Sequence, residues 1–239
     1  MPPAYAAAVP AGLDELDLVL SPAARQAIDD HVRLLIAWNA SINLTAIREP
    51  AEMARRHVVD SLTAAVLLHD VGGFLDLGSG GGFPGIPLAA ALHVERVALV
   101  DSVGKKAAFL AAAVEVAGLS SRVGVAAARA EELASEARHR ERWPAVTARA
   151  VGSLAELVEL SFPLLSVGGR LVAWKAGDIG AELDGAKRAL IALGGGDIDI
   201  EPVVGVTGLD GHLLVVVTKR GRAGAAIPRD PAVRRRLPW

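Results

Sequence analysis

The sequence predicts an α/β fold built on a mostly parallel, seven-stranded sheet with helices on both faces, preceded by an N-terminal helical extension. The first observation is that short apolar stretches alternate with longer stretches of helical periodicity from about residue 70 onward. This order is typical of parallel strands joined by right-handed helical crossovers. The second is a glycine-rich loop directly after the first apolar stretch. The third is a hydrophobic content of 52% over 239 residues, enough for one large core.

The chain before residue 70 is predicted to be helical except at its start. Residues 1–12 are rich in proline and alanine, and we expect them to be disordered. Ser21 and Pro22 suit an N-cap and a first helical turn, and apolar residues follow them at helical spacing. We expect helices over residues 22–39, from Glu49-Pro50 onward, and over 57–69. Residues 13–69 therefore form the helical extension.

The alternating part, residues 70–220, is predicted to be the main domain. We expect strands at residues 73–77, 96–100, 123–127, 145–149, 170–175, 198–204 and 213–219. The connecting helices are expected at residues 84–92, 105–117, 131–141, 154–165 and 178–193. Only a loop rich in Gly and Asp separates the last two strands, so we expect that pair to be antiparallel. Residues 221–239 form a tail too short and polar to be a domain.

The loop after the first strand has the layout of a nucleotide-type cofactor site. Glycines from Gly78 to Gly82 let the backbone take positive φ and let a ligand approach closely, and Pro84 suits the helix start that follows. Gly80, Gly82 and Gly85 also satisfy the dinucleotide pattern G-x-G-x-x-G, so a nicotinamide cofactor stays open. Asp76 favours S-adenosylmethionine, because a carboxylate near the strand end suits its ammonium and sulfonium charges.

Polar residues at the ends of the next strands are the other candidate ligands. Asp101 ends the second strand, where an acid can accept hydrogen bonds from both ribose hydroxyls. Ala130 and Glu131 follow the third strand, where backbone N–H groups could meet an adenine edge. Arg149 ends the fourth strand and would face the transferred group. Ligands of open α/β sheets bind outside these carboxyl ends, so we expect the four residues to surround one site.

A set of short motifs on both sides of the loop gives a closer indication. The motifs are Trp38-Asn39, Asn43-Leu44-Thr45, Arg48, Arg56-His57, Asp60-Ser61, Asp101-Ser102, Gly104-Lys105, Arg149-Ala150, Ser153-Leu154 and Gly211-His212-Leu213. Together they resemble the bacterial 16S ribosomal RNA guanine-N7 methyltransferase family (GidB) over roughly residues 25–219. That resemblance implies a Rossmann-like class I methyltransferase that uses S-adenosylmethionine to methylate N7 of a guanine in 16S rRNA.

The resemblance also implies which residues hold the cofactor. The positions carried over from the family are Gly78, Phe83, Ala130, Glu131 and Arg149. Asp76, Gly80 and Asp101 are added by the loop and strand-end arguments. The family often has proline where this chain has Gly81, and it varies between Leu and Phe at the Phe83 position.

The chemistry expected at this site needs alignment and no general base. Guanine N7 is an unprotonated acceptor, so it can attack a sulfonium methyl group without first losing a proton. We therefore name no catalytic base and assign Arg149 a positioning role. The six histidines show no metal-ligand spacing and there is no cysteine, so we expect no metal.

The net charge of −2 means that RNA must be met by local basic residues. The candidates are Arg48, Arg56, His57, Lys105 and Lys175, with Lys106 and Arg234–Arg236 beside them. We expect a cytoplasmic monomer without a membrane span that acts on 16S rRNA or on the small ribosomal subunit. Three other functions stay open: a nicotinamide-dependent oxidoreductase, a non-catalytic RNA-binding module, and a methyltransferase of small molecules or proteins.

Overall fold

A computed structural model describes residues 1–239 and shows a seven-stranded sheet in the order β3-β2-β1-β4-β5-β7-β6. The strands are β1 (Gly73–Leu77), β2 (Arg96–Val100), β3 (Val123–Ala126), β4 (Trp143–Arg149), β5 (Leu165–Ala176), β6 (Gly196–Pro202) and β7 (His212–Lys219). The first five strands are mutually parallel, and β7 runs antiparallel between β5 and β6. The predicted topology and the predicted antiparallel pair are therefore confirmed.

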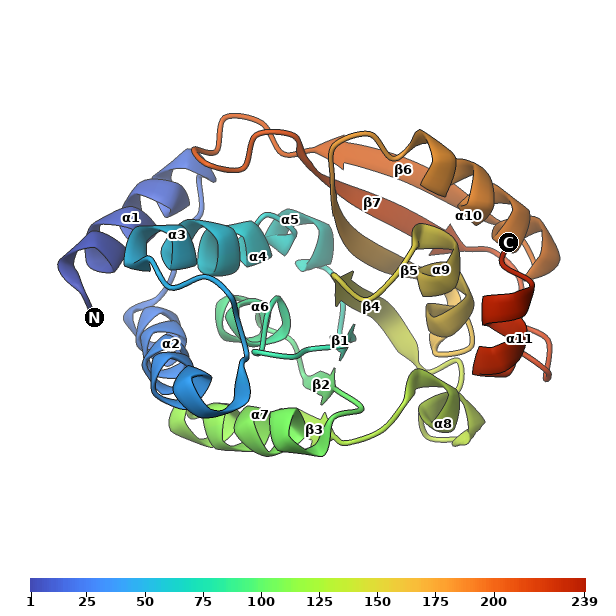
Figure 1. The fold of residues 1–239 in the computed structure, drawn as a ribbon, viewed down its shortest axis with the longest axis horizontal. Coiled ribbons are helices and arrows are strands. Elements are labelled where there is room, and N and C mark those ends of the chain that lie inside the picture. The colour runs from blue at the N-terminus through green and yellow to red at the C-terminus, as the bar shows by residue number, and fades with distance from the viewer.

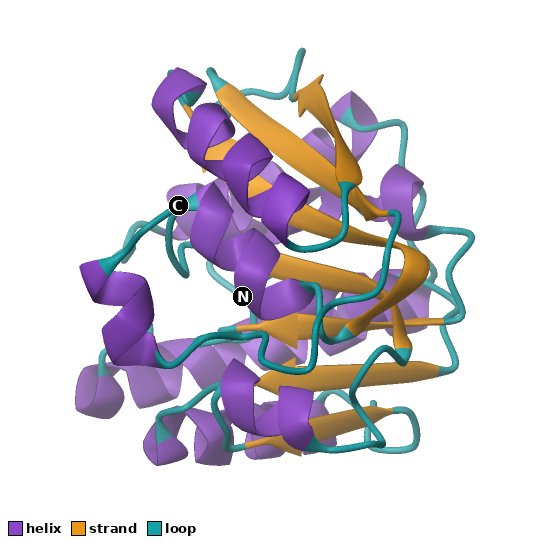
Figure 2. Cartoon of the chain, turned by 90° about the vertical axis from the view of Figure 1, so that its right-hand side faces the viewer, coloured by secondary structure: helices purple, strands orange, loops and turns teal.

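Helices cover both faces of this sheet (Figures 1 and 2). The helices before the sheet are α1 (Pro3–Glu15), α2 (Pro22–Ile42), α3 (Pro50–Met53), the π-helix η1 (Ala54–Val59), α4 (Asp60–Leu62) and α5 (Ala65–Leu68). The later helices are α6 (Gly85–Ala91), α7 (Gly104–Val116), α8 (Ala130–Ser135), α9 (Leu154–Ser161), α10 (Gly180–Ala192) and α11 (Pro231–Arg236). None of them is long and apolar enough to cross a membrane.

The core forms one layer on each face of the sheet. Phe74 of β1 packs among the N-terminal helices, α6 and α7, whereas Leu75 and Leu77 pack among α8, α9 and α10. Successive side chains of a strand point to opposite faces, so burial on both faces requires an unbroken apolar strand. This explains why β1 and β2 are apolar apart from the buried Asp76 and the exposed Arg96, and why their predicted bounds agree with the structure.

Three predicted helices differ clearly in their bounds from the observed ones. The helix expected over residues 131–141 ends at Ser135, because Glu136 is extended and Glu141 takes a positive φ of 53°. The two helices expected around residues 50 and 57–69 form one helical run from Pro50 to Leu62, followed by the short α5. The π-turns of η1 lie inside this run, and such turns are frequent at functional sites.

The prediction that residues 1–12 are disordered is wrong. Most of this segment belongs to α1, and its Tyr5 and Val9 are buried in the core. Gly12 allows α1 to approach η1 closely, since a Cβ atom there would lie 2.4 Å from Cγ2 of Val59. Alanine has the highest helix propensity, so an alanine-rich segment becomes helical once a neighbouring surface accepts its apolar face.

Candidate functional site

Two adjoining cavities open at the carboxyl ends of β1, β2 and β4, where a ligand site is expected in an open α/β sheet. The loop-side cavity, about 380 Å³, lies between the glycine loop, η1, the end of β4 and His212. The tail-side cavity, about 350 Å³, lies between the ends of β1 and β2, the start of α8, α9 and Arg234 of α11. Both are lined by Gly78, Lys106 and Ala150, so they meet at the end of β1.

Backbone hydrogen bonds to the end of β2 fix the glycine loop. The N–H groups of Gly78 and Ser79 donate to the carbonyl of Val100 at 2.8 and 2.9 Å. The N–H of Gly80 donates to Oδ2 of Asp101 at 3.0 Å. Gly80 has a φ of +52°, and no atom lies closer than 3.8 Å to the place of a Cβ there. The backbone at Gly80 is therefore not crowded, and this residue lines the loop-side cavity.

Asp101 occupies the wall predicted for it. Asp101 is 7% exposed and lines the tail-side cavity at the end of β2. Its Oδ1 accepts the N–H of Val103 at 2.9 Å, so each carboxylate oxygen already holds one backbone group. A carboxylate oxygen has more than one acceptor site, so both oxygens can accept further donors from a ligand.

Asp76 lies beneath the loop, and the expectation that its carboxylate faces the cofactor is not met. It is fully buried and lines neither cavity. Its Oδ1 accepts the hydroxyl of Thr147 at 2.7 Å, and its Oδ2 accepts the N–H of Gly85 at 3.2 Å. Burial raises the pKa of Asp76 to about 6, against the lowering effect of these donors. Asp76 thus ties β1 to β4 and to the start of α6.

Ala130 and Glu131 begin α8 and line the tail-side cavity, as predicted from their place after the third strand. Ala130 is buried, whereas Glu131 is partly exposed. The Glu131 carboxylate pairs with Nη2 of Arg234 at 2.5 Å, a contact between parts of the chain 103 residues apart. No sequence pattern predicted this pair.

Arg149 is held at the end of β4 by groups from the helical extension. Its Nη1 donates to Oδ2 of Asp60 at 2.8 Å and to the carbonyl of Arg56 at 3.1 Å. Its Nη2 lies 3.4 Å from Nδ1 of His57. Oδ1 of Asp60 is 2.9 Å from Nδ1 of His212, which comes from the start of β7. Asp60 therefore joins α4 to β4 and β7 at the loop-side cavity.

His57 and Phe83 form the floor of that cavity. Their rings stack with centroids 4.6 Å apart, and the guanidinium carbon of Arg149 lies 5.6 Å from the Phe83 ring centroid. Since Arg149 can only donate, His57 accepts at Nδ1, and its Nε2 donates to Oγ1 of Thr45 at 2.7 Å. Burial, followed by the charge of Arg149, lowers the pKa of His57 to about 3. His57 is therefore neutral near pH 7 and offers RNA no cationic contact.

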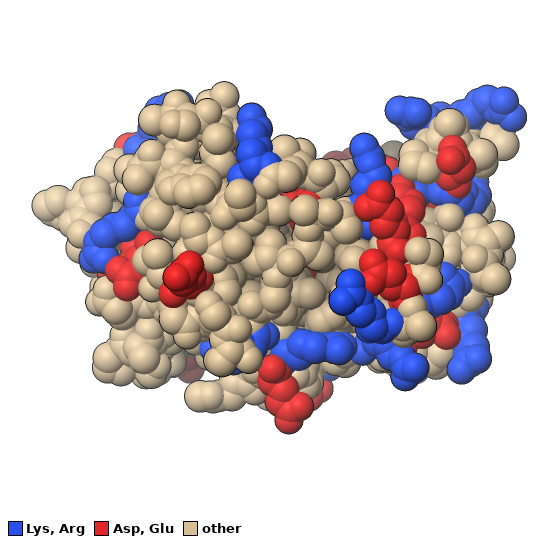
Figure 3. All heavy atoms as spheres, turned by 90° about the horizontal axis from the view of Figure 1, so that it is seen from below, with Lys and Arg blue, Asp and Glu red and all other residues tan.

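The remaining basic candidates separate into free and engaged side chains. Arg48 and Lys105 are exposed, and exposed Arg56 pairs with Glu52 while lining the loop-side cavity. Lys175 is engaged within the fold, because its Nζ donates to Glu182 at 2.6 Å and to the Gly152 carbonyl at 2.9 Å. The prediction that Lys175 contacts RNA therefore has no support here. In Figure 3 basic side chains lie beside acidic ones in small groups, with no continuous basic surface on this face.

Three functional candidates were missed as site residues from the sequence. Asp60 and His212 stood out only as members of short motifs, and Arg234 was predicted only as an RNA contact among three tail arginines. The partners of Asp60 lie 89 and 152 residues away along the chain. Only the packing of the helical extension against β4 and β7 brings them together.

Comparisons with known proteins agree with this geometry. The family model described as "rRNA small subunit methyltransferase G" (GidB) matches residues 24–205. A relative named "Ribosomal RNA small subunit methyltransferase G" from Roseiflexus sp. (strain RS-1) is 45% identical over 85% of this chain and 87% of its own. A relative of the same name from Pelotomaculum thermopropionicum is 38% identical over 95% of both chains. The crystal structure of an O-methyltransferase from Bacillus cereus in complex with SAH shares the fold, with a TM-score of 0.57 and 18% identity over 79% of this chain and 90% of that one.

Proposed function

This chain belongs to the rRNA small subunit methyltransferase G family, and on that premise we propose that its two adjoining cavities hold the two ends of S-adenosylmethionine. The enzyme transfers the methyl group of this cofactor to N7 of a guanine in 16S ribosomal RNA. The tail-side cavity takes the adenosyl group in this proposal, and the loop-side cavity takes the amino-acid part and the target guanine.

The residues of the tail-side cavity fit an adenosyl group. Asp101 lies at the end of β2, the usual address of an acid that accepts ribose hydroxyls. Ala130 and Glu131 open α8, where backbone N–H groups are free of helical partners. Gly80, whose N–H donates to Asp101 at 3.0 Å, lines the adjoining loop-side cavity. These observations support Gly78, Gly80, Asp101, Ala130 and Glu131 as cofactor-binding residues.

Arg149 suits the amino-acid end of the cofactor, which carries a carboxylate. Three of its hydrogen bonds go to Arg56, Asp60 and His57. A guanidinium has five N–H donors, so two remain for a ligand in the loop-side cavity. The Asp60 carboxylate and the Phe83 ring fix the guanidinium plane, so we propose Arg149 and Phe83 as binding and positioning residues.

Methyl transfer to N7 needs no proton acceptor from this chain. The bound cofactor supplies an electrophilic methyl group on a sulfonium, and the lone pair of guanine N7 attacks it. The nearby groups that could accept a proton are otherwise engaged: Asp60 is shared by Arg149 and His212, and His57 by Arg149 and Thr45. The cavity residues therefore act by alignment, which alone can supply a large part of a rate enhancement.

The helical extension forms the RNA side of the site in this proposal. Arg56 reaches the loop-side cavity from η1, and Lys106 reaches both cavities from α7. We propose that these side chains, with exposed Arg48 and Lys105, contact the phosphates around the target guanine. In this proposal the helical extension, up to residue 69, faces the RNA, and residues 70–220 form the catalytic domain. We also propose that the protein acts as a monomer in the cytoplasm, and that its substrate is 16S rRNA or the small ribosomal subunit.

The observation that carries this assignment is the pair of cavities meeting at Gly78 between Asp101 and Arg149. N7 methylation leaves a cationic guanine, so borohydride followed by aniline should cleave 16S rRNA at one position after incubation with enzyme and S-adenosylmethionine. A reaction without cofactor is the control. Label on a ribose or an exocyclic amine, with no new cleavage, would contradict the proposed chemistry. NAD binding in place of S-adenosylhomocysteine would contradict the cofactor.

A further inference from the structure

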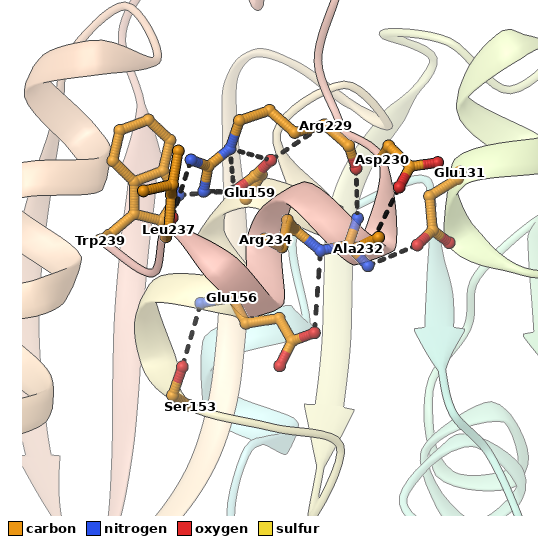
Figure 4. Close-up of polar contacts among 10 residues, drawn as sticks. All are labelled: Glu131, Ser153, Glu156, Glu159, Arg229, Asp230, Ala232, Arg234, Leu237 and Trp239. Carbon is orange, nitrogen blue, oxygen red and sulfur yellow. Dashed lines mark hydrogen bonds and ion pairs between the residues drawn. The ribbon is translucent and has the colours of Figure 1, made fainter.

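The C-terminal strap, residues Arg229–Trp239, is fastened to the catalytic domain beside the tail-side cavity (Figure 4). Its anchor is Glu159 of α9, which is completely buried. Oε1 of Glu159 accepts the backbone N–H and Nε of Arg229 at 2.8 and 2.9 Å, and Oε2 accepts Nη2 of Arg229 at 2.7 Å. Nε1 of Trp239 also donates to Oε2, at 2.5 Å. Every hydrogen-bond partner of the Glu159 carboxylate thus comes from the strap, so the strap is an integral part of the fold.

Arg234 extends from this strap into the wall of the tail-side cavity. Its side chain is 10% exposed, its Nη2 pairs with Glu131, and its Nη1 donates to the carbonyl of Arg229 at 2.8 Å. Its Nε is buried and has no hydrogen-bond partner, and the nearest carboxylate oxygen, Oε1 of Glu156, lies 3.8 Å away. A buried donor without an acceptor is costly, so this one calls for an acceptor that the protein itself does not supply.

We propose that Arg234 is a cofactor-binding residue whose Nε donates to an acceptor atom of the adenosyl group. The inference rests on the proposed function, and it adds the C-terminal strap as a wall of the cofactor site. The adenine edge and the ribose both carry acceptor atoms that meet this need. The pair with Glu131 holds the guanidinium against α8, where Ala130 begins the helix.

A purely structural role for Arg234 explains less of what is seen. In such a role Nε would donate a hydrogen bond to a group of the protein, as Nη1 does to Arg229 and Nη2 does to Glu131. The neighbouring Arg235 and Arg236 on the same helix are exposed, and neither lines the tail-side cavity. Arg234 is therefore the member of the three that lies in the cavity wall, and its Nε is the buried nitrogen left without a hydrogen-bond partner.

The test compares Arg234→Met with Arg236→Met, which makes the same chemical change at an exposed site of the same helix. Dissociation constants are measured by calorimetry for S-adenosylhomocysteine and, by competition, for adenosine. We expect Arg234→Met to weaken both ligands about tenfold, since hydrogen bonds to charged groups are worth at least that factor. Arg236→Met should leave both constants unchanged. Arg149→Ala should weaken S-adenosylhomocysteine and spare adenosine, because it acts at the other end of the cofactor.

Arg234→Lys separates the Nε contact from the ion pair, because lysine keeps the charge near Glu131 and lacks the Nε–H group. The affinities of Arg234→Lys for S-adenosylhomocysteine and adenosine should fall as those of Arg234→Met do. Its thermal unfolding midpoint should stay close to that of the wild type. Wild-type affinity in Arg234→Lys, or an equal loss in Arg236→Met, would overturn the inference. Either result would leave the proposed function standing, because that proposal is tested on the wild-type protein, by its binding of S-adenosylhomocysteine and by the cleavage assay on 16S rRNA.

Discussion

Asp60 offers the sharpest test of how the site is built, because its carboxylate pairs with Arg149 and lies close to His212. The two side chains of the Asp60–Arg149 pair are 4% and 16% exposed, and their atoms lie 2.8 Å apart. Removing one partner of a buried ion pair costs about 3–5 kcal/mol, since the other charge stays buried. Arg149 keeps its bonds to Arg56 and His57, so for Asp60→Asn we expect the unfolding free energy to fall by an amount at the lower end of that range, about 3 kcal/mol.

The assay is urea unfolding at pH 7.5, with Asp70→Asn as the matched control. Asp70 pairs with Arg170 at 2.7 Å, but the side chains are 52% and 28% exposed. An exposed pair contributes at most about 1 kcal/mol, so the same substitution there should change the unfolding free energy little. Asp60→Asn should also weaken S-adenosylhomocysteine binding, since Arg149 loses its fixed plane. Equal losses at the two positions, or a wild-type free energy in Asp60→Asn, would refute the reasoning.

Four further predictions concern the loop, the ribose acid and two buried titratable groups. Gly80→Val should abolish S-adenosylhomocysteine binding in calorimetry, because valine does not tolerate the positive φ of Gly80. The control is Gly118→Val: Gly118 has a similar φ of +67° but lies outside the site, so this variant should bind S-adenosylhomocysteine as the wild type does. Asp101→Ala should weaken that affinity by roughly 1.5–3 kcal/mol, and an unchanged constant would reduce Asp101 to a turn residue. The ring resonances of His57 should not shift between pH 5 and 8, and methyl transfer should show no acidic limb from it, since its pKa is lowered to about 3. Asp76 binds its proton more tightly in the folded than in the unfolded protein, because burial raises its pKa to about 6. The unfolding free energy of the wild type, measured relative to Asp76→Asn, should therefore fall as the pH rises from about 4 to about 6. A rise over that window would contradict the burial argument.

The sequence by itself determined the sheet, the order of strands and helices, and the strand-end positions of the cofactor residues. These features rest on patterns that act over a few residues. Apolar runs mark strands buried on both faces, and the glycines mark the loop where the backbone takes positive φ at Gly78, Gly80 and Gly82. Because parallel strands end at one edge of the sheet, the residues at the ends of β2, β3 and β4 were predicted to meet. Asp101 and Ala130 line the tail-side cavity, and Arg149 lines the adjoining loop-side cavity.

Only the tertiary structure decided which polar groups those residues face. Asp60 and Arg149 are 89 residues apart, and Glu131 and Arg234 are 103 apart, so their pairing depends on how helices dock on the sheet. The direction of Asp76 depends in the same way on Thr147 of the neighbouring strand, and the helicity of α1 depends on the surface of η1. Local propensity is weak compared with the burial of a helix face or of a charge, so packing decides at these positions.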